Sequence, residues 1–440
     1  ALSGGVSPRG PRRFSPPRAV LPALLAGLTA LAGWLAGPAA GADLRQRRFA
    51  PVGHGVHGRG INSDELLDGG LRQRAAEALD RFSEDFRELH PGVKFQLMTF
   101  PEDKLARQLR FRQQGGLGPD LLLVNSRTAL ELHRKQLVQS VRFPPELLQQ
   151  IDPDMLRRVR LDDGSLVGLP VLQLPQLACF NRERLPAGSP DSLDGLLQLS
   201  SRGLRVGLST NPIHLFWTAG GLGAAEALLA AQGAAPLNAE QKQSLERWLA
   251  WLQNASLQQS ITFQEKQEEL VRQLAEGDLD WISCRSSNIA LLREKLGAAL
   301  GVASLPGGPW GEPTPINRER VLVFGRNSSP AQQRIAREVA RFSVNPRVQR
   351  NLTLSTLILL PVNRFVPAPV ASSAVLAAMV RSAEQSERST PVIHGLMSNN
   401  GAEKALSALL NRVLFGELSP REAAVILPAD LGAALHRSPP

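Results

Sequence analysis

Helix-forming and strand-forming segments alternate over residues 71–138, and this alternation restricts the fold more than any other feature of the sequence. The run GLRQRAAEALDRFSEDFRELH has apolar side chains at spacings of three and four, which predicts an amphipathic helix that ends at Pro91. VKFQLMTF is then typical of a strand, DKLARQLRFRQQGGLG of a helix, PDLLLVN of a short apolar strand, and SRTALELHRKQLV of a helix capped by Ser126. Strands that are buried on both faces and separated by helices predict an α/β fold with a mostly parallel sheet.

Two prolines interrupt a second apolar segment, LVGLPVLQLPQLACFN, at Pro170 and Pro175. Because proline lacks the backbone N–H that a sheet ladder uses, this segment is not expected to lie in the middle of one sheet. The pattern indicates a chain that passes from one part of the molecule to another.

The size and charge of the chain limit the classes of function. Its 440 residues, 43% of them apolar, suffice for a large core divided over two or three domains. The formal net charge is +10, but Arg and Glu are interspersed along the helical segments, which is typical of solvated faces. A stripe of positive charge that could follow a phosphate backbone is not evident, so we expect no nucleic-acid partner.

The first 42 residues have the features of a secretory signal peptide. A basic region, PRGPRRFSPPR, precedes the apolar run AVLPALLAGLTALAGWLAG, and the small residues of Ala40-Gly41-Ala42 then match a cleavage motif. We expect cleavage after residue 42, export to the periplasm, and no lipid anchor, because no cysteine lies near this motif. An uncleaved membrane anchor is the alternative, since the apolar run approaches the length that spans a bilayer.

Only two cysteines are present, Cys179 and Cys284. They could pair in an oxidising compartment, but two buried free thiols are the commoner outcome in a large domain, and we expect that outcome. His54 and His57 form the only close histidine pair, and the glycines around them favour a linker over a metal site. We therefore expect no metal and no cofactor.

The order of these and later segments resembles the extracellular solute-binding proteins of ABC importers, the family that binds maltose, oligosaccharides and glycerol phosphate. The motifs that carry the resemblance are PGVKFQ, GPDLLLVN, DGSLVGLPV, ACFNRERL, EGDLDWISCRSSN, GVASLPGGP, LILLPVNRFV and SALLNRVLFGELSPREAAVIL. The resemblance implies an α/β, two-lobed periplasmic-binding-protein fold, with mostly parallel sheets flanked by helices and hinge crossings between the lobes. The segment with Pro170 and Pro175 would be the first crossing.

The resemblance also implies how the chain divides. After a signal peptide of residues 1–42, the first lobe would comprise residues 43–172 and 301–345. The second lobe would comprise residues 173–300 and the helical part 346–440. The family usually begins with a clear hydrophobic strand, for which residues 47–70 offer at best a short, glycine-rich substitute.

The loop CRSSN is the strongest candidate for a ligand site. It follows a predicted strand and precedes a predicted helix, so hydroxyl, amide and guanidinium groups would point into a cleft between the lobes. The matching loop of the family contacts the ligand, and the residues expected to do so here are Arg285, Ser286, Ser287 and Asn288. An ordinary helix cap with a surface arginine is the alternative.

Further substrate contacts are expected at strand ends, beside the first crossing and in a polar loop near the C-terminus. These residues are Asn125, Ser126, Gln173, Gln176, Asn211, Trp217 and His394. A helix cap is the alternative role for Ser126, and core packing is equally expected for Trp217. Trp248 and Trp251 lie at helical spacing with leucines, so we interpret them as core residues.

The function implied by the resemblance is that of the periplasmic substrate-binding component of an ABC transporter. The protein would bind a saccharide, glycoside or polyol between its lobes, act as a monomer, and deliver the solute to a membrane permease. A sensor or scaffold that has lost transport function is the alternative, motivated by the absence of tyrosine from the chain. We expect no enzyme and no catalytic residue, because no catalytic motif with supporting context is present.

Overall fold

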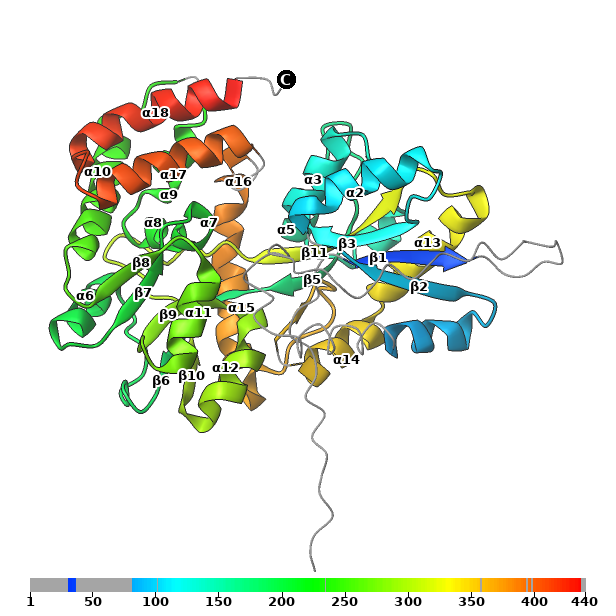
Figure 1. The fold of residues 1–440 in the computed structure, drawn as a ribbon, viewed down its shortest axis with the longest axis horizontal. Helices are drawn as coiled ribbons and strands as arrows, with labels where there is room; N and C mark the ends of the chain where they lie inside the picture. Colours follow the sequence, from blue (N-terminus) through cyan, green and yellow to red (C-terminus); the bar gives the residue numbers. More distant parts are fainter. Residues whose placement is uncertain are drawn as a thin grey trace, which may run out of the picture.

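The computed structural model describes residues 31–36, 81–100, 102–233, 235–356, 358–392, 395–396 and 399–436. Within these ranges the chain forms two lobes, each built around one sheet with helices packed against it (Figure 1). This arrangement confirms the predicted α/β class and the division into two lobes.

Sheet 1 forms the centre of lobe 1 and has the strand order β12-β5-β11-β3-β1-β2, with β4 also paired to β11. Its strands are β1 (Leu31–Ala36), β2 (Lys94–Thr99), β3 (Leu121–Asn125), β4 (Val138–Gln139), β5 (Leu169–Leu174), β11 (Arg318–Gly325) and β12 (Leu360–Pro361). Every pairing between these strands is antiparallel. The prediction of a mostly parallel sheet is therefore wrong for lobe 1.

Two strands that come from elsewhere in the chain explain this difference. β2, β3 and β5 run in the same direction, as the alternation of helices and strands predicts, but they are not neighbours. β1 lies between β2 and β3, and β11 lies between β3 and β5, each antiparallel to both of its neighbours. A helix–strand alternation fixes the direction of its own strands only, so it cannot show which later strand inserts between them.

The strand β1 comes from the segment expected to be a signal peptide. Leu31–Ala36 pairs along its whole length with β2, and residues 31–33 also pair with β3. It occupies the place of the first strand that residues 47–70 were expected to supply, and those residues lie outside the described ranges. The rest of the expected signal peptide also lies outside them.

Sheet 2 forms the centre of lobe 2 and has the strand order β10-β6-β9-β7-β8. Its strands are β6 (Gln176–Asn181), β7 (Val206–Ser209), β8 (Ile261–Gln264), β9 (Trp281–Arg285) and β10 (Leu300–Ala303). β7 runs parallel to β8 and β9, whereas β6 runs antiparallel to β9 and β10. The predicted parallel pairing is thus present in one half of this sheet.

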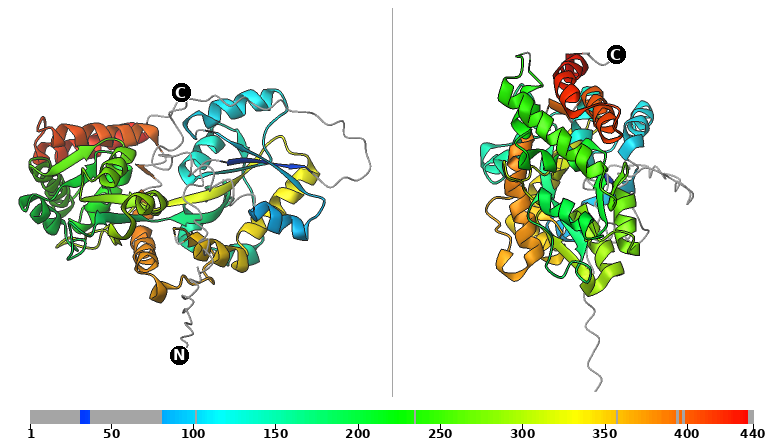
Figure 2. Two further views of the ribbon diagram at one scale, coloured as in Figure 1. Left: turned by 60° about the horizontal axis from the view of Figure 1, so that its bottom comes forward. Right: turned by 90° about the vertical axis from the view of Figure 1, so that its left-hand side faces the viewer.

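Helices cover both sheets (Figure 2). Lobe 1 has α2 (Glu102–Gln114), α3 (Ser126–Arg134), α4 (Pro145–Leu148), α5 (Pro153–Arg157), α13 (Pro330–Ser343) and α14 (Pro346–Thr356). Lobe 2 has α6 (Leu193–Ser201), α7 (Pro212–Leu215), α8 (Trp217–Gly221), α9 (Ala225–Ala230), α10 (Ala239–Ser256), α11 (Gln267–Glu276), α12 (Ile289–Leu296), α15 (Ala374–Ser386), α16 (Thr390–Val392), α17 (Asn400–Leu414) and α18 (Pro420–His436). Trp248 and Trp251 of α10 are 1% and 7% exposed, which confirms them as core residues.

The chain passes between the two sheets where the prolines predicted a crossing. β5 ends at Leu174 and β6 begins at Gln176, so Pro175 alone separates sheet 1 from sheet 2. Gly168 lies just before β5 at a close contact with β11, where an added Cβ would lie 2.4 Å from the carbonyl oxygen of Leu322. Glycine at this position therefore lets the start of β5 approach the β11 backbone closely.

Two further segments connect the lobes. The second crossing, residues 304–317, joins β10 to β11, and the third, residues 362–373, joins β12 to α15. Both lie later in the chain than the expected limits at residues 301 and 346. The reason is that β10 stays in sheet 2 through its pairing with β6, and β12 returns to sheet 1 through its pairing with β5.

A disulfide joins β6 to β9 in lobe 2. Cys179 and Cys284 are bonded, with their Cα atoms 5.7 Å apart. The expectation of two free thiols is therefore wrong: neighbouring antiparallel strands bring the two cysteines within bonding distance, although 105 positions separate them in sequence.

Candidate functional site

The candidate ligand loop, Arg285–Asn288, lies directly beside the first crossing. β9 ends at Arg285, and residues 286–288 form one 3₁₀ turn that leads into α12. The backbone N–H of Ser286 donates to the carbonyl of Pro175 at 2.9 Å, and Arg285 lies opposite Gln176 in the sheet. The loop is therefore attached to the one residue that separates the two sheets.

The Arg285 side chain links this loop to two other segments. Its guanidinium is fully buried, donates from Nη1 to the carbonyl of Ile316 at 2.9 Å, and lies 3.4 Å from Nδ1 of His214 through Nη2. Gln176 contacts the same two residues, because its Nε2 donates to the His214 carbonyl and its Oε1 accepts from the Ile316 N–H. Arg285 and Gln176 thus hold α7 and the second crossing against the end of β9.

The hydroxyls of Ser286 and Ser287 are the most informative atoms of the loop. Both side chains are at most 1% exposed, and neither Oγ has a hydrogen-bond partner among the described residues. A buried hydroxyl without a partner costs about 1–3 kcal/mol, so native proteins contain few of them without a reason. A ligand that supplies the missing partner is such a reason.

The structure places three other expected site residues at helix or strand ends. Asn125 caps α3, with its Oδ1 accepting from the N–H of Thr128 at 2.8 Å, so Ser126 is the first helical residue and the predicted cap at Ser126 is wrong. Asn211 caps α7 in the same way, accepting from the N–H of Ile213 at 2.9 Å. These bonds engage the side-chain oxygen of Asn125 and that of Asn211.

The remaining expected residues lie in different surroundings. Gln173 is buried in β5 opposite Glu319, and Trp217 is fully buried with its ring 6.1 Å from that of Trp281. The position of Trp217 confirms core packing, although its Nε1 has no hydrogen-bond partner among the described residues. His394 lies outside the described residues.

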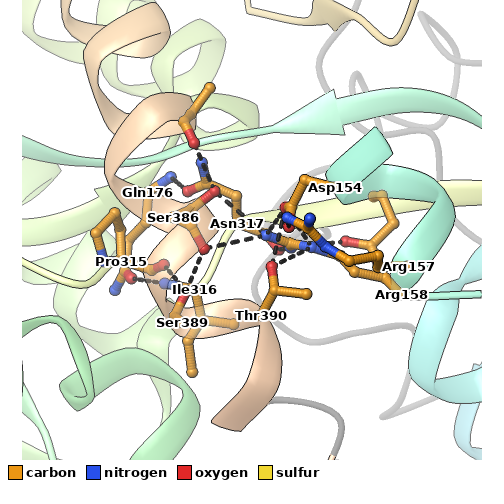
Figure 3. A network of polar contacts seen from close by, with 12 residues as sticks. Asp154, Arg157, Arg158, Gln176, Pro315, Ile316, Asn317, Ser386, Ser389 and Thr390 are labelled. Atoms are coloured by element: carbon orange, nitrogen blue, oxygen red, sulfur yellow. Dashed lines mark hydrogen bonds and ion pairs between the residues drawn. The ribbon is translucent and has the colours of Figure 1, made fainter. Parts of the chain in front are cut away.

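A buried polar network, not predicted from the sequence, joins the two lobes at the hinge (Figure 3). At its centre Arg158, which follows α5 of lobe 1, forms ion pairs with Asp154 at 3.0 Å and with Glu319 of β11 at 3.2 Å. The same guanidinium donates to the hydroxyls of Ser386 and Thr390 in lobe 2, each at 3.2 Å. Burial alone would lower the pKa of Arg158, but the carboxylates of Glu319 and Asp154 raise it above its ordinary value.

Asn317, at the end of the second crossing, ties the crossings to each other. Its Oδ1 accepts from the N–H of Gln176 at 2.8 Å and from the hydroxyl of Ser382 at 3.1 Å, and its Nδ2 donates to the Ser382 carbonyl. The Ser382 hydroxyl also donates to the carbonyl of Gln176 at 2.7 Å. These bonds fix both crossings and α15 as one unit beside the candidate loop.

One ion pair connects the lobes away from the hinge. Arg127 of α3 contacts Glu403 of α17, and these helices lie on the facing sides of the two lobes in Figure 1. Because α3 belongs to lobe 1 and α17 to lobe 2, this contact requires the lobes to be close at this edge.

A cavity of about 650 Å³ lies in lobe 2 beside the second crossing. Its walls include Ser189, Asp191, Glu312, Arg381 and Arg388, and no expected site residue lines it. Arg381 forms an ion pair with Glu312 at 3.2 Å, and hydrogen bonding from Arg381 holds the pKa of Glu312 below its ordinary value. This cavity is separate from the candidate ligand loop.

Comparison with known proteins identifies the fold. Neither a family model nor a curated protein sequence matches the chain. Its structure is similar to the GacH receptor of Streptomyces glaucescens, described without ligand and with acarbose, at 15% identity and a TM-score of 0.63 over 83% of this chain and 96% of that one. The chain has the two-lobed fold of ABC solute-binding proteins.

Two further solute-binding proteins show the same fold. A cyclo/maltodextrin-binding protein in complex with maltotetraose has 15% identity and a TM-score of 0.64, and the match covers 85% of this chain and 96% of that one. UgpB from Mycobacterium tuberculosis, in complex with glycerophosphocholine, has 15% identity and a TM-score of 0.63 over 82% of this chain and 96% of that one.

Membrane-spanning helices and metal sites are both absent from the described residues. Within the ranges given above, no helix combines the length and apolar character needed to cross a bilayer. No group of His, Cys, Asp and Glu side chains in these ranges is arranged to hold a metal ion.

Proposed function

We propose that this protein is the periplasmic substrate-binding component of an ABC importer and that it binds a saccharide, glycoside or polyol between its lobes. The observation that carries the proposal is the pair of buried hydroxyls, Ser286 and Ser287, which lack hydrogen-bond partners among the described residues. They lie in a loop attached to the hinge of a two-lobed fold, where a ligand could contact both lobes.

The attachment of the loop to the hinge supports a mechanism of lobe closure. The Ser286 N–H binds the Pro175 carbonyl, so rotation of one lobe about Pro175 changes the distance between the loop and the other lobe. A solute that bonds to the loop and to lobe 1 favours the closed arrangement, because it makes both sets of contacts only there. Closure would then present one surface to a membrane permease, and we infer that a single chain suffices for this.

The class of solute follows from the donors and acceptors available. Acarbose and maltotetraose, two ligands of the similar structures, are saccharides rich in hydroxyl groups, and the third, glycerophosphocholine, carries two hydroxyls on its glycerol part. Ser286 and Ser287 can each donate to and accept from such a group. The chain has no tyrosine, and Trp217 packs in the core, so we expect recognition to rest more on hydrogen bonds than on stacking of sugar rings.

A thermal-shift screen of saccharides, glycosides, polyols and their phosphates tests the proposal. A solute at 100 times its dissociation constant stabilises the native state by about 2.7 kcal/mol, which is a clear rise in melting temperature. Ser286→Ala and Ser287→Ala should each reduce this rise, and the double variant should reduce it most, while the ligand-free protein stays at least as stable, because each substitution removes a buried hydroxyl without a partner among the described residues.

Ser201→Ala is the matched control, since that hydroxyl lies at the exposed end of α6 and donates to a helix carbonyl. It should leave the shift unchanged. A screen in which none of these solutes raises the melting temperature would contradict the proposal and favour a sensor or scaffold without small-molecule affinity.

A further inference from the structure

Lobe 1 carries a cationic surface that solute binding does not explain. Residues 345–373, which comprise α14, β12 and the third crossing, contain no Asp or Glu, yet they include Arg347, Arg350 and Arg364. A folded stretch of this length normally mixes both signs of charge on its solvated faces, so this composition indicates a surface directed at something negative.

The helix α14 presents part of this surface as one face. Arg347, Arg350 and Leu354 are exposed, with Leu354 46% exposed, and they follow one another at spacings of three and four. Side chains at this spacing lie on the same side of a helix. The opposite side of α14 contacts the core through Gln349 and Thr353, both of which are buried.

The third crossing begins beside α14. The Val362 N–H donates at 2.8 Å to Oε1 of Gln349, on the buried side of the helix, and Arg364 and Phe365 follow two and three residues later. Phe365 is 61% exposed, and the Arg364 guanidinium carbon lies 5.0 Å from the centre of its ring. We call Arg347, Arg350, Leu354, Arg364 and Phe365 the basic face.

The arginines of the basic face have no acidic partner in the part of the chain that the structure describes. There, no carboxylate forms an ion pair with Arg347, Arg350 or Arg364. Arg272 of α11 shows the ordinary arrangement, because it pairs with two glutamates of its own helix, Glu269 and Glu276. The three unpaired charges of the basic face are therefore available to an external anion.

The basic face lies away from the sites already described. In Figures 1 and 2, α14 is at the edge of lobe 1 opposite α2 and α3, with sheet 1 between them. The contact with lobe 2 through Arg127 is on the α3 side. A partner on the basic face would thus leave that contact, and the movement of the lobes at that edge, unobstructed.

We propose that the basic face binds the surface of an anionic lipid bilayer. Arginines at such a surface gain from its negative potential, and Leu354 and Phe365 between them can enter the boundary between headgroups and acyl chains. Exposed apolar side chains flanked by unpaired arginines fit this surface better than they fit an acidic protein, which would offer charge but no apolar layer. The binding would hold an importer's receptor near the membrane where its permease lies.

Flotation of the full chain with lipid vesicles tests this proposal. The vesicles consist of phosphatidylcholine alone or of equal parts of phosphatidylcholine and phosphatidylglycerol, and the readout is the ratio of the two bound fractions. Each arginine near an anionic surface contributes roughly a fivefold increase in binding, so Arg347→Glu/Arg350→Glu should lower this ratio at least tenfold. High salt should lower it for the native chain as well.

The matched control is Arg107→Glu/Arg110→Glu on α2, which has the same spacing, the same charge change and an exposed phenylalanine, Phe111, beside it. It should keep the native ratio. All variants share the basic and apolar N-terminal segment, so its contribution to the ratio is the same in each, and the difference between variants measures the substituted arginines. The melting temperature of each variant shows whether the reversed charges disturb folding. If they do, Arg347→Gln/Arg350→Gln gives the same test with a smaller change of charge.

Three outcomes would overturn the proposal. The first is a native chain that does not distinguish the two kinds of vesicle, which would mean that the partner of the basic face is not an anionic lipid. The second is an Arg347/Arg350 variant that keeps the native ratio, and the third is an α2 control that loses as much binding as these variants do. Since no step uses the ligand loop, these results are independent of the solute screen.

Discussion

Arg127 of α3 and Glu403 of α17 form an ion pair between the two lobes. Their side chains are 33% and 14% exposed, so the pair is partly shielded from water. It is made from two helices that belong to different lobes, and it can exist only when the lobes are close. The pair therefore reports on closure, and it suggests a first experiment.

Arg127→Gln should weaken solute binding without lowering the stability of either lobe. A partly exposed ion pair contributes about 0.2–1 kcal/mol, so we expect the dissociation constant to rise by a factor of up to about five. Calorimetric titration measures this change. Lys135→Gln is the control, because it breaks an ion pair with Glu131 at the end of α3 that does not involve lobe 2. An equal loss of affinity in this variant would exclude a role for the interlobe contact.

Arg158→Met should destabilise the whole protein. The substitution removes the cation from the buried carboxylate of Glu319 and leaves Asp154 paired with Arg157 alone, and breaking a buried ion pair costs about 3–5 kcal/mol. Denaturant unfolding measures the loss. Arg272→Met, which breaks an exposed network on α11, should cost less than about 1 kcal/mol, and similar costs for both substitutions would contradict the role given to the hinge network.

Removal of the disulfide should lower stability and loosen the ligand loop. The bond closes a loop of 105 positions, for which chain-entropy models give a stabilisation of about 4–5 kcal/mol. Cys179→Ala/Cys284→Ala should show this loss in denaturant unfolding. Because Cys284 directly precedes Arg285, amide hydrogen exchange of residues 285–288 should also become faster, while exchange in sheet 1 stays as it was.

Asp280→Asn should destabilise the protein near neutral pH but not in acid. Burial alone would raise the pKa of Asp280, but hydrogen bonds from Arg205 lower it below its ordinary value. A lowered pKa in the folded state means that the carboxylate stabilises above the ordinary pKa of about 3.9, and that this stabilisation is lost as the pH falls through the folded pKa.

Unfolding curves at several pH values test this claim. The difference between native chain and Asp280→Asn should be about 1–3 kcal/mol at neutral pH and should shrink below pH 4 or so. Asp278→Asn, at an exposed position two residues earlier, should change stability little at either pH. A difference that does not depend on pH would mean that the amide substitution acts through packing and not through charge.

Local features of the sequence predicted the first crossing. Pro175 marks the transition between sheets because proline cannot donate to a ladder. The family resemblance implied a ligand loop between a strand and a helix, and β9 and α12 lie on either side of residues 286–288. The family resemblance supplied the two lobes. The roles of the site residues remain predictions, since only their placement is described.

Contacts between distant parts of the chain could not be predicted in this way. Arg158 and Thr390 are 232 positions apart, and Cys179 and Cys284 are 105 apart, so no local pattern brings them together. The insertion of β11 between β3 and β5 is equally non-local, and it made sheet 1 antiparallel.

Calorimetric titration of the best solute from the screen into the native chain and into Ser286→Ala/Ser287→Ala tests the central claim most directly. The account predicts saturable binding to the native chain with one solute per chain. Because each lost hydrogen bond costs about 1 kcal/mol or more, the double variant should bind at least tenfold more weakly. Equal affinity of the two proteins would contradict the assignment of the ligand loop, and no binding to the native chain would contradict the function itself.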